Sequence, residues 1–147
     1  MRSLIAKLFG ARARLSALEK MILECVGHHL DSRLLNLWSR QIQAINKVQR
    51  LPQGIEVNFY RMKNGRPSFD EDLAFPNRTT ELLAAKVRVE VCGVATLNAK
   101  VWCVKGFLFS IEYDGGVSYF EEAAGMDPKP EIRLACELTA DLAAVLF

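Results

Sequence analysis

The spacing of apolar residues changes once along this chain, near Gly54, and this change limits the folds that it can adopt. Before Gly54, apolar residues recur every three or four positions, which is the period of an α-helix. After Gly54, they alternate with polar residues, which is the period of a β-strand. Helices followed by strands, with no βαβ alternation, are typical of an α+β domain with a mainly antiparallel sheet.

Two helices are predicted in the first part of the chain. The first carries one apolar seam along about seven helical turns: Leu4, Leu8, Ala11, Leu15, Leu18, Ile22 and Cys25. We expect Gly27 to end this helix in the left-handed conformation that glycine adopts at low cost. Asp31 or Ser32 is the expected N-cap of the second helix, whose apolar stripe continues to Val48. The short connection between them predicts an antiparallel helical hairpin over residues 1–52.

The remainder of the chain, residues 53–147, is predicted to form a five- to six-stranded, mainly antiparallel sheet against which the hairpin packs. The strands are expected near residues 55–60, 87–91, 99–104, 107–113 and 132–138, with 117–120 as a sixth. A long loop, residues 66–80, follows the turn signal Asn64–Gly65. The sequence leaves residues 140–147 open between strand, helix and disorder. No domain boundary is evident, so we expect a single domain, residues 1–147.

The two parts differ in charge. Residues 1–50 hold nine basic and three acidic side chains, whereas residues 51–147 hold ten basic and fourteen acidic ones. Such a division can attract an anionic partner, or it can draw the two parts together. The basic side chains of the helices, which would contact phosphates in a nucleic-acid complex, are Arg12, Arg14, Arg33, Arg40, Lys47 and Arg50. They lack interleaved aromatic residues, so nucleic-acid binding ranks third among the functions considered.

No motif in the sequence indicates a catalytic, cofactor or metal site. A Gly-rich phosphate loop, GxSxG, HExxH and paired CxxC motifs are all absent. Cys25, His28 and His29 form a compact set of potential metal ligands, but no second Cys/His group lies near them in sequence. Cys92 and Cys103 would face each other only if their hairpin turned at residues 97–98. We therefore expect no cofactor, no metal and free thiols.

The strand around Trp102 is apolar on both faces. Trp102 and Val104 alternate with Val101 and Cys103, so each set occupies one face. A strand of this kind is normally covered on both sides. The helices are expected to cover one face, and the other requires the 66–80 loop, a second subunit or a partner protein.

These observations favour a non-catalytic protein–protein interaction domain, of adaptor or immunity type and with self-association left open. Its partner would be another protein, bound around Trp102 and Val104, or a second copy, bound through the helical seam or through the Trp102 face. The alternative is an enzyme or small-ligand-binding protein whose site lies between the sheet and the 66–80 loop. The polar side chains available to either site are Tyr60, Arg61, Arg66, Asp70, Glu71 and Asp72.

The chain is expected to be cytoplasmic. The apolar run at Leu4–Ile5 is interrupted by Lys7, and no stretch approaches the roughly 20 apolar residues of a membrane span. The first twenty residues are basic and contain a single acid, Glu19. That composition is also typical of an organellar presequence or a membrane-surface helix, and this alternative stays open.

Overall fold

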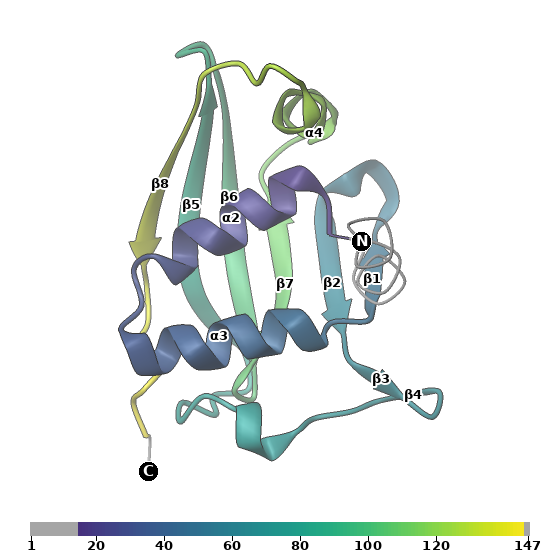
Figure 1. The fold of residues 1–147 in the computed structure, drawn as a ribbon, viewed down its shortest axis with the longest axis vertical. Helices are drawn as coiled ribbons and strands as arrows, with labels where there is room; N and C mark the ends of the chain where they lie inside the picture. The colour runs from purple at the N-terminus through teal and green to yellow at the C-terminus, as the bar shows by residue number, and fades with distance from the viewer. Residues whose placement is uncertain (1–14, 146–147) are drawn as a thin grey trace, which may run out of the picture.

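A computed structural model describes residues 15–145, which form three helices and a six-stranded sheet, together with a small two-stranded hairpin (Figure 1). The helices are α2 (Ala17–Gly27), α3 (Ser32–Ala44) and α4 (Ser118–Gly125). The strands of the large sheet are β1 (Lys47–Arg50), β2 (Glu56–Tyr60), β5 (Leu82–Val91), β6 (Ala95–Val104), β7 (Phe107–Tyr113) and β8 (Ile132–Leu138). The smaller elements are β3 (Met62–Lys63), β4 (Arg66–Pro67) and two 3₁₀ turns, η1 (Pro52–Gly54) and η2 (Glu71–Leu73).

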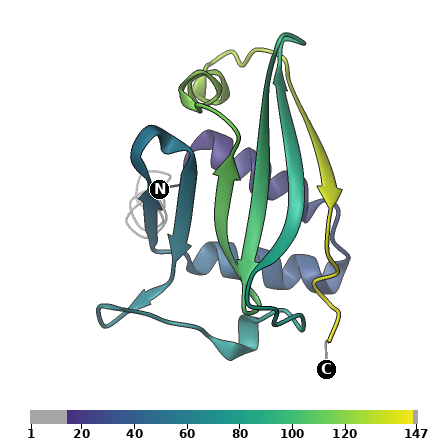
Figure 2. The same ribbon diagram turned by 180° about the vertical axis from the view of Figure 1, so that it is seen from behind.

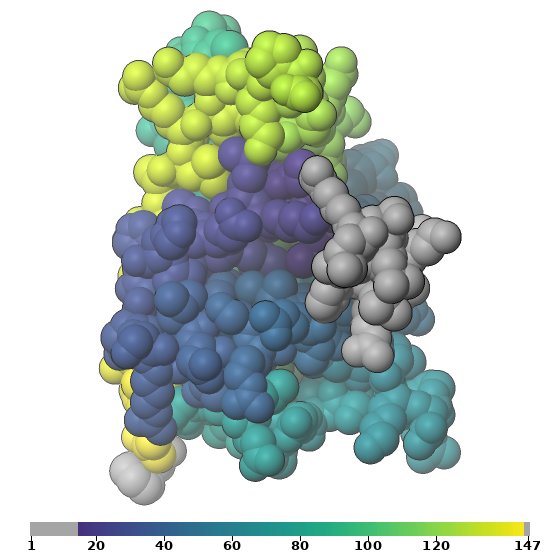
Figure 3. Space-filling model, viewed as in Figure 1, coloured from purple at the N-terminus to yellow at the C-terminus, as the bar shows by residue number. Residues whose placement is uncertain are grey.

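The large sheet has the order β1-β2-β7-β6-β5-β8, and every neighbouring pair is antiparallel. Helices α2 and α3 lie side by side across one face of it (Figure 1) and form a continuous layer there (Figure 3). The view from behind shows the opposite face of the strands with no helix in front of it (Figure 2). The predicted fold class, a helical hairpin packed on an antiparallel sheet, is therefore confirmed.

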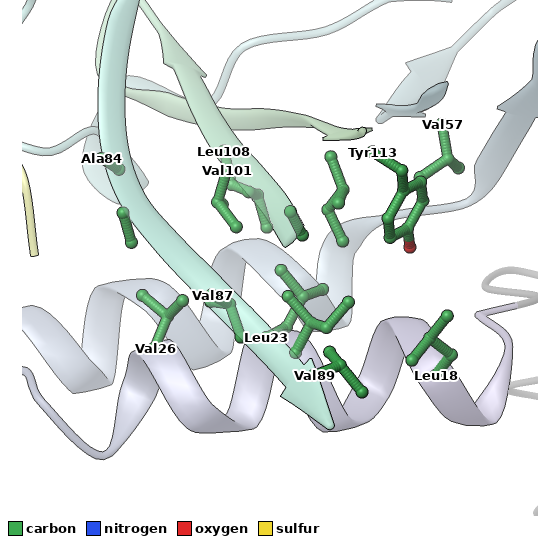
Figure 4. Packing of buried hydrophobic residues seen from close by; sticks show 14 of the residues in the cluster. Leu18, Leu23, Val26, Val57, Ala84, Val87, Val89, Val101, Leu108 and Tyr113 are labelled. Atoms are coloured by element: carbon green, nitrogen blue, oxygen red, sulfur yellow. The ribbon is translucent and has the colours of Figure 1, made fainter. Parts of the chain in front are cut away.

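The core lies between the helical layer and this covered face. Leu18, Leu23 and Val26 project from α2 toward the sheet (Figure 4), and all three are buried. They meet the buried valines of the central strands, including Val87 and Val101. Full burial of one such side chain contributes roughly 1.5–3 kcal/mol, so this contact accounts for much of the attachment of α2 to the sheet.

The first helix begins later than its apolar seam suggests. Ser16 has an extended backbone (ψ 164°), and its Oγ accepts a hydrogen bond from the Glu19 amide at 3.1 Å. The Glu19 carboxylate accepts a bond from the Ser16 amide in return, at 2.8 Å, which completes a capping box. The prediction that the helix carrying the seam from Leu4 to Cys25 continues through Ser16 is thus wrong. The part of the seam before Leu15 lies outside the described residues.

The first helix ends at Gly27, as expected, but not through the left-handed conformation. A Cβ at this position would lie 3.2 Å from Leu35 Cδ1 and 3.3 Å from Trp38 Cδ1, both on α3. The glycine is therefore explained by the close approach of the two helices and not by the helix end.

The second helix starts as predicted but ends earlier. Asp31 is its N-cap, and the Asp31 carboxylate accepts a hydrogen bond from the Leu34 amide at 2.9 Å. The helix stops at Ala44, and Val48 belongs to β1, where it lies opposite Phe59 of β2. The predicted boundary at residue 52 is consequently wrong, because pairing with β2 draws residues 47–50 into the sheet.

The strand predictions hold for β2, β5, β6, β7 and β8, with one correction, at residues 117–120. The β5–β6 hairpin turns at Cys92–Gly93, both of which have positive φ, so Cys92 does not face Cys103. All four cysteines are free. Residues 118–125 form α4 in place of the predicted strand 117–120, because Phe120, Ala123 and Ala124 bury one helical face. Residues 140–145 are neither helix nor strand, and residues 146–147 are not described.

Gln41 connects three parts of the fold from within the core. Its side chain is fully buried on α3, where Nε2 donates to the carbonyls of Leu73 (2.7 Å) and Gly106 (3.0 Å). Its Oε1 accepts a hydrogen bond from the Leu108 amide at 2.8 Å. The side chain thereby fastens both the long loop and the β6–β7 turn to the helical layer.

We predict that Gln41→Leu lowers the free energy of unfolding by about 2–4 kcal/mol, because it withdraws the partners of buried backbone groups. Chemical denaturation measures this loss. Gln43→Leu is the matched control, since Gln43 is exposed on the same helix, and it should change stability by no more than about 0.5 kcal/mol. Equal losses in the two variants would contradict the role assigned to Gln41.

Candidate functional site

The uncovered face of the sheet carries a row of charged side chains that crosses five strands. The strand registers place each member directly opposite the next: Glu56, Glu112, Lys100, Lys86 and Glu137. Two acids from β2 and β7 are thus followed by two lysines from β6 and β5 and by one acid from β8. Such side chains contribute to sheet pairing, and they also give this face a defined pattern of charge.

A shallow hollow of about 790 Å³ lies over this row. Its basic lining comes from Lys86, Arg88 and Lys100, and its acidic lining includes Glu112 and Asp114. Asp114 is held in place by Asn98, which donates to its carboxylate from Nδ2 at 2.9 Å and from its amide at 3.0 Å. These hydrogen bonds lower the pKa of Asp114, so this carboxylate stays ionised near neutral pH.

Trp102 lies in the next row of the same face, between Ser110 of β7 and Leu83 of β5. It is partly exposed, and its Nε1 donates to Glu112 Oε1 at 3.4 Å. Val104, two residues further along β6, is also partly exposed. Within residues 15–145 no helix lies in front of this face of the strands (Figure 2). The face combines apolar and charged groups in adjacent rows.

The long loop covers only the end of this face beyond Trp102. The ring of Phe69 packs on Phe107 with centroids 5.4 Å apart, and the ring of Tyr60 meets Phe109 edge-on at 5.5 Å. A cavity of about 130 Å³ lies among these four rings, and Val104 also lines it. Of the predicted site residues, Tyr60, Arg61 and Val104 therefore meet here, whereas Trp102 does not line this cavity.

Arg61 is mostly buried beneath the loop. Its Nε donates to the Gln41 carbonyl at 3.2 Å and its Nη1 to the Leu108 carbonyl at 2.8 Å. Its Nη2 is buried without a hydrogen-bond partner among the described residues. Desolvation lowers the pKa of this guanidinium to about 10. Arg61 also borders a hollow of about 520 Å³, which Lys63 and Asp70 line as well.

The remaining predicted residues of the loop do not converge on one point. Arg66 is exposed in β4, and Asp72 is exposed in η2. Asp70 caps η2 by accepting a hydrogen bond from the Asp72 amide at 3.0 Å. Glu71 forms an ion pair with Arg78, in which Arg78 Nη1 lies 2.7 Å from Glu71 Oε2. The acidic run is therefore engaged in local structure, and of these four residues only Asp70 shares a hollow with Arg61.

The basic side chains of the helices are dispersed. Arg33 and Arg40 are exposed on α3, whereas Arg50 on β1 forms an ion pair with Glu19, with Nη2 and Oε1 2.8 Å apart. The Glu19 carboxylate is almost fully buried, so this pair joins α2 to the sheet. Arg12 and Arg14 lie outside the described residues.

Sequence reasoning missed two groupings that the fold creates. The first is the row of Lys86, Lys100 and Glu112. These residues are the polar positions in strands where polar and apolar residues alternate, and this alternation could have placed them together on one face. The second joins Cys25 and His29 to Cys136, and their potential ligand atoms lie within 4.8 Å of one another. Nothing in the spacing of the sequence indicated that β8 would pass beside the end of α2.

Comparison with known proteins finds no matching family model, no matching curated protein and no matching solved structure. Within residues 15–145, no helix combines the length and the apolar character that a membrane span requires.

We predict that Arg78 holds the pKa of Glu71 below its ordinary value of 4.5. The cause is the hydrogen-bonded ion pair, which favours the ionised carboxyl. A depressed folded-state pKa stabilises the protein above the unfolded value, and this contribution is lost as the pH falls through the folded value. A ¹³C NMR titration of the Glu71 carboxyl measures the pKa, and Arg78→Ala should return it toward 4.5. An unchanged pKa in that variant would contradict the assignment.

Proposed function

We propose that this chain is a non-catalytic protein-binding domain, of adaptor or immunity type, and that the open face of its sheet receives the partner. The observation that carries the proposal is the partial exposure of Trp102 beside the exposed charged side chains of Lys86, Lys100 and Glu112. Protein interfaces combine an aromatic or apolar centre with polar groups around it. Adjacent rows on one accessible surface provide both.

The charge pattern supports a partner that carries acidic and basic groups at a matching spacing. On the open face, Glu112 and Asp114 lie to one side of Lys86, Arg88 and Lys100. Charged groups of this kind orient an approaching partner and exclude proteins with the wrong pattern. The pattern also suits a second copy of the chain, since a twofold rotation would bring its acids over the lysines of the first copy.

A second candidate function is the binding of a small molecule in the hollow beside Arg61. This hollow of about 520 Å³ is within the size range of ligand sites, and Asn46, Arg61, Lys63, Ser68 and Asp70 line it with polar groups. The buried Nη2 of Arg61, which lacks a partner in the described part of the chain, supports this candidate. It ranks second because Nη2 is not accessible to solvent, so a ligand would need a local rearrangement to reach it.

The test is co-purification from the native host with the wild-type chain and two double variants. Lys86→Gln with Lys100→Gln alters the open face, and Lys20→Gln with Arg33→Gln removes the same charge from exposed positions on the helices. We predict that the open-face pair lowers recovery of the partner, or self-association in sedimentation, by about 10-fold or more. The helical pair should behave like the wild type.

Equal recovery in both double variants would contradict the proposal. A small molecule that elutes with the protein, without any protein partner, would also contradict it and would favour the hollow beside Arg61. A partner that is lost only in the helical variant would place the interface on the opposite side of the molecule.

A further inference from the structure

Three potential metal ligands from separate segments meet where α2 ends beside the edge strand β8. Cys25 is on α2, His29 follows the helix, and Cys136 is on β8 (Figure 1). Their sulfur and nitrogen ligand atoms all lie within 4.8 Å of one another. Both thiols are free and half-buried, and the histidine is exposed. The group therefore combines soft ligands with access from solvent.

The ring of His29 is already oriented by the backbone. Its Nδ1 lies 2.9 Å from the carbonyl oxygen of Cys25. A carbonyl oxygen only accepts hydrogen bonds, so Nδ1 must carry the proton in this contact. The lone pair of a neutral ring then resides on Nε2. Histidines that bind metals are commonly held in this way, with the second ring nitrogen donating to a carbonyl.

We propose that Cys25, His29 and Cys136 form a zinc(II) site whose fourth position is taken by water. Cysteine sulfur and histidine nitrogen are the ligands that zinc prefers, and a set of three protein ligands leaves one position of its tetrahedron open. Oxygen-seeking cations such as Mg²⁺ and Ca²⁺ do not suit this donor set. Each thiol releases its proton on binding, and the two thiolates neutralise the dipositive ion. No net charge is therefore placed at this half-buried position.

The site would join two elements, α2 and β8, that lie against each other in the fold. Strand β8 lies at the edge of the sheet and has β5 as its single strand neighbour among the described residues. A metal held by Cys136 and by Cys25 would connect this edge strand to the end of α2. Because the ligands come together only in the folded chain, binding of the metal should also stabilise the fold.

Titration of the reduced protein with Co²⁺ tests this site, because cobalt replaces zinc and reports its ligands by absorption. A phosphine reductant keeps Cys25 and Cys136 from forming a disulfide. We expect sulfur-to-cobalt charge-transfer absorption and the intense visible bands of a four-coordinate ion, both abolished by added Zn²⁺. We also expect Zn²⁺ to raise the thermal midpoint of the protein.

Two variants remove ligands, and each has a matched control. Cys136→Ser is compared with Cys92→Ser, which changes an exposed thiol in the β5–β6 turn, and His29→Ala with His28→Ala. The ligand variants should bind Co²⁺ at least about 100-fold more weakly. Loss of a group that only hydrogen-bonds to a metal ligand already weakens metal binding by about 10- to 100-fold. His29 is exposed, so its variant tests the site without disturbing the core.

The controls should bind as the wild type does, with the same absorption. Absence of the cobalt bands in the wild type would overturn the proposal. Unchanged affinity in His29→Ala, or equal losses in Cys136→Ser and Cys92→Ser, would overturn it as well.

Discussion

The packing of α2 and α3 against one face of the sheet determines what the other parts of this molecule can do. Trp38, Ile22 and Leu23 are almost completely excluded from solvent between the helices and the strands. The Glu19–Arg50 ion pair and the Gln41 hydrogen bonds then fix the helical layer in position. Because both long helices lie on one side, residues 15–145 leave the other face with the loop at one end and no helix over its centre. Trp102 and the charged row lie on this less covered face.

The fold class could be predicted because the period of the apolar residues changes once and local signals agree with it. Neighbouring residues alone predict a helix cap at Asp31 or Ser32 and a strand at the alternating valines of β5, and the structure has both the cap, at Asp31, and the strand. The errors arose where tertiary contacts decide. Val48 fits a helical stripe, but pairing with Phe59 places it in a strand. Gly27 resembles a helix terminator, whereas the approach of Trp38 explains why no side chain is present.

The composition of the candidate sites was harder to predict than the fold, because it depends on contacts between residues far apart in sequence. The alternation around Trp102 correctly predicted a strand with apolar groups on both faces. Which charged side chains lie beside Trp102 depends on the neighbouring strands of the sheet, β5 and β7, and on their registers. The sequence places Arg61 near the loop but does not predict that it is buried against the carbonyls of Gln41 and Leu108. Cys136 belongs to an ordinary alternating strand, so its proximity to Cys25 and His29 required the register of β8.

Site-specific photo-crosslinking in the native host tests the central claim, that the open face receives the partner. A photoreactive amino acid would replace Lys100 on this face, and in a second strain it would replace Arg33 on the helical layer; both positions are exposed. We predict a covalent adduct with one defined protein, or with a second copy of the chain, from position 100 and none from position 33. An adduct from position 33 alone, or the same adducts from both positions, would contradict it.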